Sequence, residues 1–283
     1  MGISASSLEI ISKNGAGLVT TKSLTSEPRS GHPGPVTARF DGGLLNCMGL
    51  CNPGIGEGLG EADLYREKTG RPVMVSLFAT SAQEFTDLAL KTGSSRGDLL
   101  ELNLSCPNVA DEFGVPLAAS PQAVSQIVGA VKKVSRIPVI AKLSPNVPDI
   151  RVIARAAEEA GADALCLINT LGPGMLIDIR TRRPVLSNLY GGLSGPCVKP
   201  VALRLVHQAY STVSIPVIGM GGIATGEDAV EMLMAGAALV GVGTAVMDRG
   251  LEVFDSINRE ILAFMDEQNF PRLSDIPKLE KHT

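Results

Sequence analysis

The sequence predicts an α/β fold of alternating parallel strands and helices, and most specifically a (β/α)8 TIM barrel. Short, largely apolar segments alternate with segments of helical periodicity along the chain. Three expected helices end in a glycine that leads back into a strand: Gly15, Gly161 and Gly236. Three expected strands begin with a proline, whose missing N–H is tolerated there: Pro72, Pro138 and Pro216. These recurring signals indicate one strand-and-helix unit repeated along the chain.

We expect strands in seven apolar segments: 17–21, 72–79, 98–104, 138–143, 164–169, 216–220 and 238–243. Because these segments are predominantly apolar rather than alternating, both faces of each strand should be covered, as in a parallel sheet. A closed barrel needs an eighth strand. The chain is therefore expected to begin just after the first barrel strand, with a short helix over residues 4–13. An open seven-stranded sheet is the alternative.

Two segments break the alternation of strands and helices, residues 27–52 and 172–195. The first contains three prolines and a predicted hairpin turn at Asp41-Gly42-Gly43, and the second contains a turn-like stretch at 180–184. Both segments follow strands, so we expect both to lie over the C-terminal face of the barrel as insertions. No long linker divides the chain, which predicts a single domain over residues 1–283.

Composition favours a small-molecule ligand over a nucleic acid or a membrane. The chain of 283 residues has a net charge of −4, and its lysines and arginines are scattered rather than clustered. No apolar segment reaches the roughly 18 residues of a transmembrane helix, and no export signal is visible. The 5 cysteines form no CxxC pair, so we expect no metal site and no disulfide framework, and a cytoplasmic protein.

The functional residues of a (β/α)8 barrel lie at the C-terminal ends of its strands. Polar residues follow the expected strands here: Lys22, Ser23, Ser76, Asn103, Cys106, Asn108, Lys142, Ser144, Asn169 and Thr170. The last two strands end in Gly221-Gly222 and Gly243-Thr244. Glycines let backbone N–H groups approach phosphate oxygens, so these loops predict a phosphate site, although glycines also serve simple tight turns.

Five of these residues suggest the chemistry more closely. Lys22 and Lys142 converge on one end of the barrel, which implies either an anionic ligand or a Schiff base. Cys106 directly follows a strand between polar neighbours, which favours a catalytic base over the usual small buried residue. The amides of Asn103 and Asn108 suit the edge of a planar imide.

Seven short motifs together resemble the class 1 dihydroorotate dehydrogenases, and most closely their NAD-linked, two-subunit branch. The most specific is Asn103-Leu104-Ser105-Cys106-Pro107-Asn108-Val109. The others, in chain order, are residues 21–23, 46–54, 142–147, 168–170, 191–196 and 219–223. The resemblance extends from Gly15 to about Met265. The family's opening strand, which places an Ala-Ser-Gly stretch against FMN, has no counterpart in the sequence.

The resemblance implies an FMN enzyme that oxidises (S)-dihydroorotate to orotate in pyrimidine biosynthesis. In that scheme Cys106 removes the C5 proton while hydride passes from C6 to the flavin. The implied substrate-binding residues are Lys22, Asn46, Met48, Gly49, Leu50, Asn103, Asn108, Asn169 and Thr170. The implied FMN-binding residues are Lys22, Ser23, Asn103, Lys142, Ile168, Ser194, Gly195, Gly221, Gly222, Gly243 and Thr244.

The resemblance also implies partners. It suggests a homodimer of this subunit, or a heterotetramer with a second subunit that carries FAD and an iron–sulfur cluster and passes electrons to NAD. This sequence contains neither a nicotinamide-binding GxGxxG motif nor a cysteine cluster for such a centre.

Three other functions stay open from the sequence alone. A dihydropyrimidine dehydrogenase-like enzyme would act on uracil or thymine from a similar barrel. A Schiff-base aldolase or decarboxylase would use Lys142 or Lys22 as its nucleophile. A structural subunit without activity is the third, because the expected barrel lacks its first strand.

Overall fold

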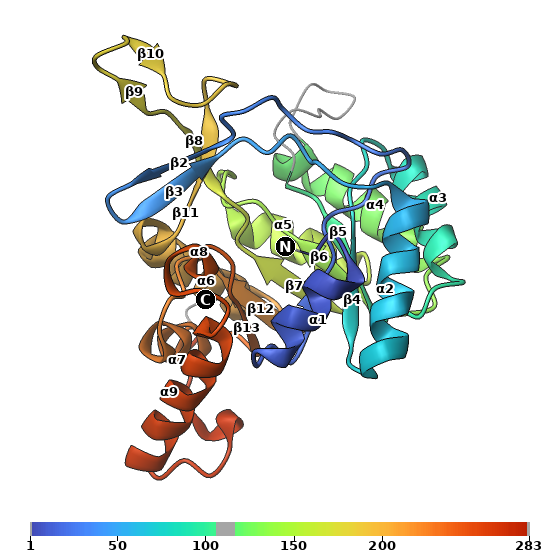
Figure 1. Ribbon diagram of the computed structural model, residues 1–283. Helices are drawn as coiled ribbons and strands as arrows, with labels where there is room; N and C mark the ends of the chain where they lie inside the picture. The colour runs from blue at the N-terminus through green and yellow to red at the C-terminus, as the bar shows by residue number, and fades with distance from the viewer. Residues whose placement is uncertain (1, 106–116, 282–283) are drawn as a thin grey trace.

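A seven-stranded parallel sheet forms the centre of the computed structural model, which describes residues 2–105 and 117–281 (Figure 1). Its strands lie in the order β1-β4-β5-β6-β7-β12-β13, which is their order along the chain. Their bounds are Val19–Thr20, Val73–Leu77, Leu99–Asn103, Val139–Lys142, Ala164–Leu167, Val217–Met220 and Leu239–Gly241. Each strand lies within a segment predicted from the sequence, so all seven strand predictions are confirmed.

Helices follow the strands and pack around the outside of the sheet. Their bounds are α1 Ala5–Lys13, α2 Ile55–Thr69, α3 Ala82–Thr92, α4 Pro121–Lys132, α5 Ile150–Glu159, α6 Lys199–Thr212, α7 Gly226–Met234, α8 Ala245–Arg249 and α9 Val253–Glu267. The 3-10 turns within the described residues are η1 Leu117–Ala119, η2 Pro196–Val198 and η3 Leu273–Asp275. Successive helices contact one another, as α3 does α4 and α4 does α5.

Alternation along the strands divides the core into two layers. Val73, Val75 and Leu77 of β4 lie in the large cluster between sheet and helices, whereas Met74 lies in a smaller cluster with Ile140 and Cys166. Because successive residues of a strand point to opposite faces, this smaller cluster marks the interior face of the curled sheet. The polar residues in register with it therefore also face the interior.

The helix ends explain why the predicted units form. Five of these helices begin with a side chain that accepts a hydrogen bond from the first turn, at Ser4, Ser81, Ser120, Asp149 and Thr225. After α7, Gly236 has a φ of +115°, and a Cβ there would lie 2.1 Å from the ring of Tyr210. Glycine is thus required at this helix end, as the sequence predicted.

The two segments that break the alternation form one small antiparallel sheet (Figure 1). Its order is β2-β3-β11-β8, with bounds Thr37–Phe40, Gly43–Asn46, Gly191–Ser194 and Leu171–Gly174. The hairpin predicted at Asp41-Gly42-Gly43 joins β2 and β3. A further pair, β9 (Ile177–Asp178) and β10 (Arg183–Pro184), projects from the body of the molecule as a short arm.

Strands β1 and β13 are the two edges of the parallel sheet, and within residues 2–105 and 117–281 no further strand pairs with their outer sides. The curled parallel sheet with helices outside fits the predicted (β/α)8 barrel, with seven of its strands present here. In the same described residues, no helix combines the length and the apolar character needed to cross a membrane.

Candidate active site

An open cavity of about 160 Å³ lies at the C-terminal ends of β6, β7, β12 and β13, and β11 of the small sheet also lines it. Eight of the predicted FMN-binding residues line this cavity: Lys142, Ile168, Ser194, Gly195, Gly221, Gly222, Gly243 and Thr244. Two predicted substrate-binding residues, Asn169 and Thr170, line it as well. Tertiary structure thus gathers residues as far apart in the sequence as Lys142 and Thr244.

The glycine loops give this cavity features of a phosphate site. Gly222 has a φ of +80°, and a Cβ there would lie 2.6 Å from the Cβ of Lys199. Gly243 differs, because a Cβ there would meet no atom within 4 Å. In the described part of the chain, the backbone N–H groups of Gly222, Ile223, Gly243 and Thr244 have no hydrogen-bond acceptor. Unpaired amides beside open space suit an anionic group.

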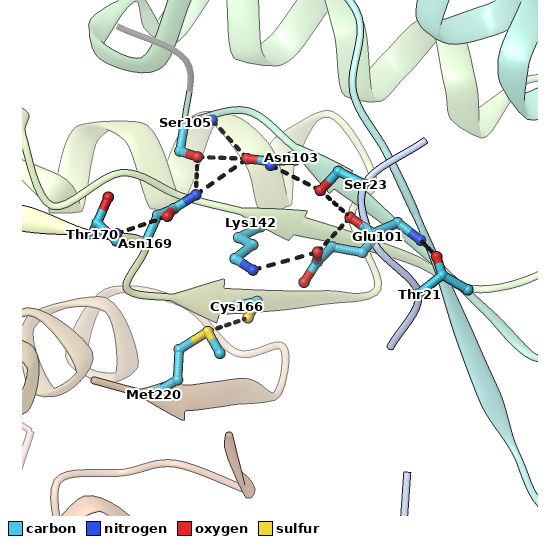
Figure 2. Close-up of polar contacts among 11 residues, drawn as sticks. Thr21, Ser23, Glu101, Asn103, Ser105, Lys142, Cys166, Asn169, Thr170 and Met220 are labelled. Carbon is cyan, nitrogen blue, oxygen red and sulfur yellow. Dashed lines mark hydrogen bonds and ion pairs between the residues drawn. The ribbon is translucent and has the colours of Figure 1, made fainter. Parts of the chain in front are cut away.

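A cluster of amide and hydroxyl groups lies beside the cavity (Figure 2). The Nδ2 of Asn169 donates to Ser105 Oγ, and lies 3.4 Å from Asn103 Oδ1. Ser105 Oγ donates in turn to Asn103 Oδ1, and the backbone N–H of Thr170 donates to Asn169 Oδ1 at 2.7 Å. Residues at the ends of two separate strands, β5 and β7, are therefore brought into one polar cluster.

Glu101 is a site residue that sequence reasoning missed. It lies in β5 between Leu100 and Leu102, is only 2% exposed, and lies 3.6 Å from the ammonium of Lys142 (Figure 2). Its Oε1 also accepts a hydrogen bond of 2.8 Å from Ser76 Oγ. The sequence did contain a signal for this residue, because a carboxylate stands inside an otherwise apolar strand. Carboxylates are almost never buried unless they are paired, so a buried one indicates a partner group nearby.

Strand register explains this grouping. Ser76 of β4 is the direct neighbour of Glu101 in β5, and Asn103 is the neighbour of Lys142 in β6. Lys142 is in turn the neighbour of Cys166 in β7. Since residues two apart in a strand share a face, Glu101 and Asn103 both point into the interior beside Lys142.

The two predicted lysines have opposite pKa shifts. Burial is the largest single influence and lowers the pKa of Lys142, but the charge and hydrogen bond of Glu101, together with Cys166, outweigh it, and the pKa lies above its ordinary value. Burial, followed by the charge of Lys142, lowers the pKa of Lys22, and Cys51 opposes this in part. The two ammonium groups are thus within electrostatic reach of each other, as predicted, but only Lys142 has a carboxylate partner in the described chain.

Ser23 joins the lysine side of the site to the amide side. Its Oγ lies 2.9 Å from Ser76 Oγ and accepts a hydrogen bond of 3.0 Å from Asn103 Nδ2. Ser76 is held from its backbone as well, because its N–H donates to Thr21 Oγ1 at 3.0 Å.

The end of β3 and the loop that follows it carry four predicted substrate-binding residues. Asn46 Nδ2 donates weakly to Gly192 O at 3.4 Å, which ties the loop to β11. Gly49 and Leu50 have φ values of +71° and +58°, and Met48 is exposed. Within the described residues, none of these last three makes a hydrogen bond to the amide cluster. The structure therefore places Asn46 in the small sheet but does not join the rest of the loop to the cavity.

A family model described as dihydroorotate dehydrogenase matches residues 1–265 of this chain. The chain belongs to the dihydroorotate dehydrogenase family. A relative from Methanothermobacter thermautotrophicus is 45% identical over 276 residues, which cover 98% of this chain and 90% of the relative. A relative from Pyrococcus abyssi is 47% identical over 264 residues, covering 93% and 87%. Both are named dihydroorotate dehydrogenase B (NAD(+)), catalytic subunit.

Family membership confirms the resemblance inferred from the motifs. Two predicted residues of the dihydroorotate dehydrogenase motif, Cys106 and Asn108, lie outside the described residues. Ser105, the last residue described before them, belongs to the amide cluster. The chain that follows β5 therefore starts, at Ser105, directly beside the side chains of Asn103 and Asn169.

Proposed function

We propose that this chain oxidises (S)-dihydroorotate to orotate in pyrimidine biosynthesis, as the FMN-dependent catalytic subunit of an NAD-linked enzyme. The observation that carries the proposal is the cluster of Asn103, Ser105, Asn169 and Thr170 beside a cavity that contains a lysine and unpaired backbone amides, in a chain of this family.

The cavity suits FMN on physical grounds. Open space at Gly243 and the free amides of Ile223 and Thr244 fit a phosphate, and Lys142 supplies a positive charge deeper in the barrel. Ser194, Gly195, Gly221 and Gly222 would hold the rest of the phosphate and ribityl chain, and Ser23, Lys22, Asn103, Lys142 and Ile168 the ring system. FMN, when bound, supplies the hydride acceptor.

The amide cluster suits orotate, which carries alternating N–H donors and carbonyl acceptors and one carboxylate. Asn103 and Asn169 present both amide donors and acceptors, and Asn46, Asn108 and Thr170 would complete the set. Lys22 would pair with the carboxylate, and the backbone of Met48, Gly49 and Leu50 would pack on the ring. Cys106 would remove the C5 proton, because a cysteine thiolate is a suitable base.

Electrons must leave this chain for NAD. The relatives named above are each described as a catalytic subunit, which supports a second subunit in the complex. We infer that this partner carries FAD and an iron–sulfur cluster, and that the catalytic subunit forms a homodimer within a heterotetramer. Four cysteines described here are free thiols, Cys47, Cys51, Cys166 and Cys197, which supports a reducing, cytoplasmic environment.

A Schiff-base enzyme using Lys142 fits the site less well. An amine nucleophile needs a lowered pKa, whereas the ion pair with Glu101 raises the pKa of Lys142. Family membership and the amide cluster together favour the flavin oxidoreductase.

The experiment is to purify the chain, record its absorbance spectrum, and measure dihydroorotate oxidation with an artificial electron acceptor. The proposal predicts bound or reconstitutable FMN and formation of orotate, with no reaction on dihydrouracil or dihydrothymine. Turnover of the dihydropyrimidines instead would favour the dihydropyrimidine dehydrogenase-like activity. A chain that binds no FMN and produces no orotate would contradict the proposal.

A further inference from the structure

Glu101 is the one buried carboxylate at the base of the described site. Its side chain is 2% exposed, and Leu100 and Leu102 on either side are fully buried. An ionised carboxylate in such a place is costly unless it is paired and hydrogen-bonded. Glu101 has both kinds of partner, the ammonium of Lys142 at 3.6 Å and the hydroxyl of Ser76 at 2.8 Å.

The groups that face Lys142 come from three strands. Glu101 lies on β5, the thiol of Cys166 on β7, and Lys22 follows β1. Burial, and then the charge of Glu101, raise the pKa of Cys166, so that group is a neutral thiol. Among the residues that the structure describes, Glu101 is therefore the only anion that faces Lys142.

Glu101 also determines the direction of a hydrogen-bond chain. An ionised carboxylate only accepts hydrogen bonds, so Ser76 must donate its single hydroxyl proton to Glu101. Ser76 Oγ must then accept from Ser23 Oγ, which leaves Ser23 to accept from Asn103 Nδ2. With its Nδ2 occupied in this way, Asn103 turns its Oδ1 towards Ser105 and Asn169.

We propose that Glu101 is a positioning residue, which holds Lys142 as a cation at the base of the cavity and fixes the amide orientation of Asn103 through Ser76 and Ser23. Its importance for dihydroorotate oxidation rests on the function proposed above. The first of these effects, the charge of Lys142, is a property of the chain itself and can be measured without FMN.

The first test measures the titration of Lys142 in the full chain without added ligand. Lysines are dimethylated with ¹³C-formaldehyde, the Lys142 signal is assigned by its loss in Lys142→Arg, and its chemical shift is followed with pH. In Glu101→Gln, which keeps a hydrogen-bond acceptor but removes the charge, Lys142 should titrate at least about one pH unit lower than in the unaltered chain. An unchanged titration in Glu101→Gln would overturn the proposal.

Two variants serve as controls for this titration. Ser76→Ala breaks the hydrogen-bond chain but keeps the carboxylate, so Lys142 should still titrate high. Glu9→Gln removes the partner of Lys13 in an exposed pair on α1 and should leave the Lys142 signal unmoved. Should Glu101→Gln fail to fold, Glu101→Asp withdraws the carboxylate by one methylene. Lys142 should then titrate at an intermediate pH, and a titration equal to that of the unaltered chain would count against the proposal.

The second test addresses the orientation of Asn103. Orotate affinity is measured from the change in flavin absorbance of the FMN-loaded protein. Ser76→Ala should weaken orotate binding by about tenfold, because Asn103 is no longer held in one orientation. Equal orotate affinity in Ser76→Ala and the unaltered chain would refute this half of the proposal. If the unaltered chain binds neither FMN nor orotate, the proposed function fails, whereas the Lys142 titration still decides the role of Glu101.

Discussion

Lys142 and Glu101 form an ion pair across neighbouring strands in the interior of the barrel, with Lys142 Nζ 3.6 Å from Glu101 Oε1. The carboxylate is almost fully buried, whereas the lysine side chain retains 18% of its exposure at the edge of the cavity. The ammonium of Lys142 is thus a fixed positive charge at the edge of the cavity, where a ligand would contact it. The buried carboxylate of Glu101 neutralises that charge.

Removing the lysine leaves the carboxylate without its counter-charge. We expect Lys142→Met to lower the free energy of unfolding by about 3–5 kcal/mol at neutral pH, because a lone buried charge is strongly destabilising. The double variant Glu101→Gln/Lys142→Met should recover most of that loss. Chemical denaturation of the two single variants and the double variant measures the coupling. Additive losses would mean that the two groups do not stabilise each other.

The thiol of Cys106 is the proposed base. Cys106→Ser should lower dihydroorotate oxidation at neutral pH by about 10²–10⁴-fold, because a hydroxyl is rarely deprotonated, while FMN stays bound. Stopped-flow flavin reduction measures the step directly. Cys197→Ser is the matched control, since that exposed thiol donates only to Ser194 O and a hydroxyl can do the same. Flavin reduction at the unaltered rate in Cys106→Ser would exclude the thiol as the base.

Gly243 borders open space in the cavity. A leucine there meets no protein atom at its Cβ, so Gly243→Leu should fold with stability changed by no more than about 0.5 kcal/mol. The same side chain would occupy the space proposed for FMN, so the affinity of the protein for FMN should fall at least about tenfold. Fluorescence titration of FMN with the apoprotein measures this loss. Gly60→Leu on the exposed face of α2 is the control and should bind FMN normally, and equal affinity in both variants would place FMN elsewhere.

Asp228, on α7, stabilises the loop of Gly221 and Gly222 that leads into this helix, because its carboxylate accepts a hydrogen bond from the N–H of Ala224. Burial alone would raise the pKa of Asp228 above its ordinary 3.8, but hydrogen bonds from Lys199 at 2.6 Å and from the N–H of Ala224 hold it lower. A lowered pKa means that this stabilisation is present above pH 3.8 and is lost as the pH falls below that value.

Asp228→Asn should therefore lower the free energy of unfolding by about 1.5–3 kcal/mol at neutral pH. The difference from the unaltered chain should shrink as the pH falls below 3.8. Urea denaturation at several pH values measures both effects. The exposed Asp266→Asn on α9 is the control, and a loss in Asp228→Asn that does not vary with pH would show that charge is not its cause.

Much of the barrel could be read from local patterns. Apolar segments, prolines at strand starts and glycines after helices each depend on neighbours in the chain, and all seven strands were placed from them. The antiparallel sheet was only partly foreseen. The hairpin at Asp41-Gly42-Gly43 has its own turn signal, whereas the pairing of β3 with β11 joins segments about 150 residues apart and has none.

The fold class, the family and the ring of polar residues at the strand ends could all be inferred from the amino-acid sequence. How those residues act on one another depends on contacts between strands that lie far apart in the chain. Ser76, Glu101, Lys142 and Cys166 lie next to each other through the register of four strands, and no local pattern encodes register between distant strands. The charge state of Lys142 and the orientation of Asn103 follow from that register, because both depend on the carboxylate of Glu101. In the sequence, that residue is one charged position within an otherwise apolar strand.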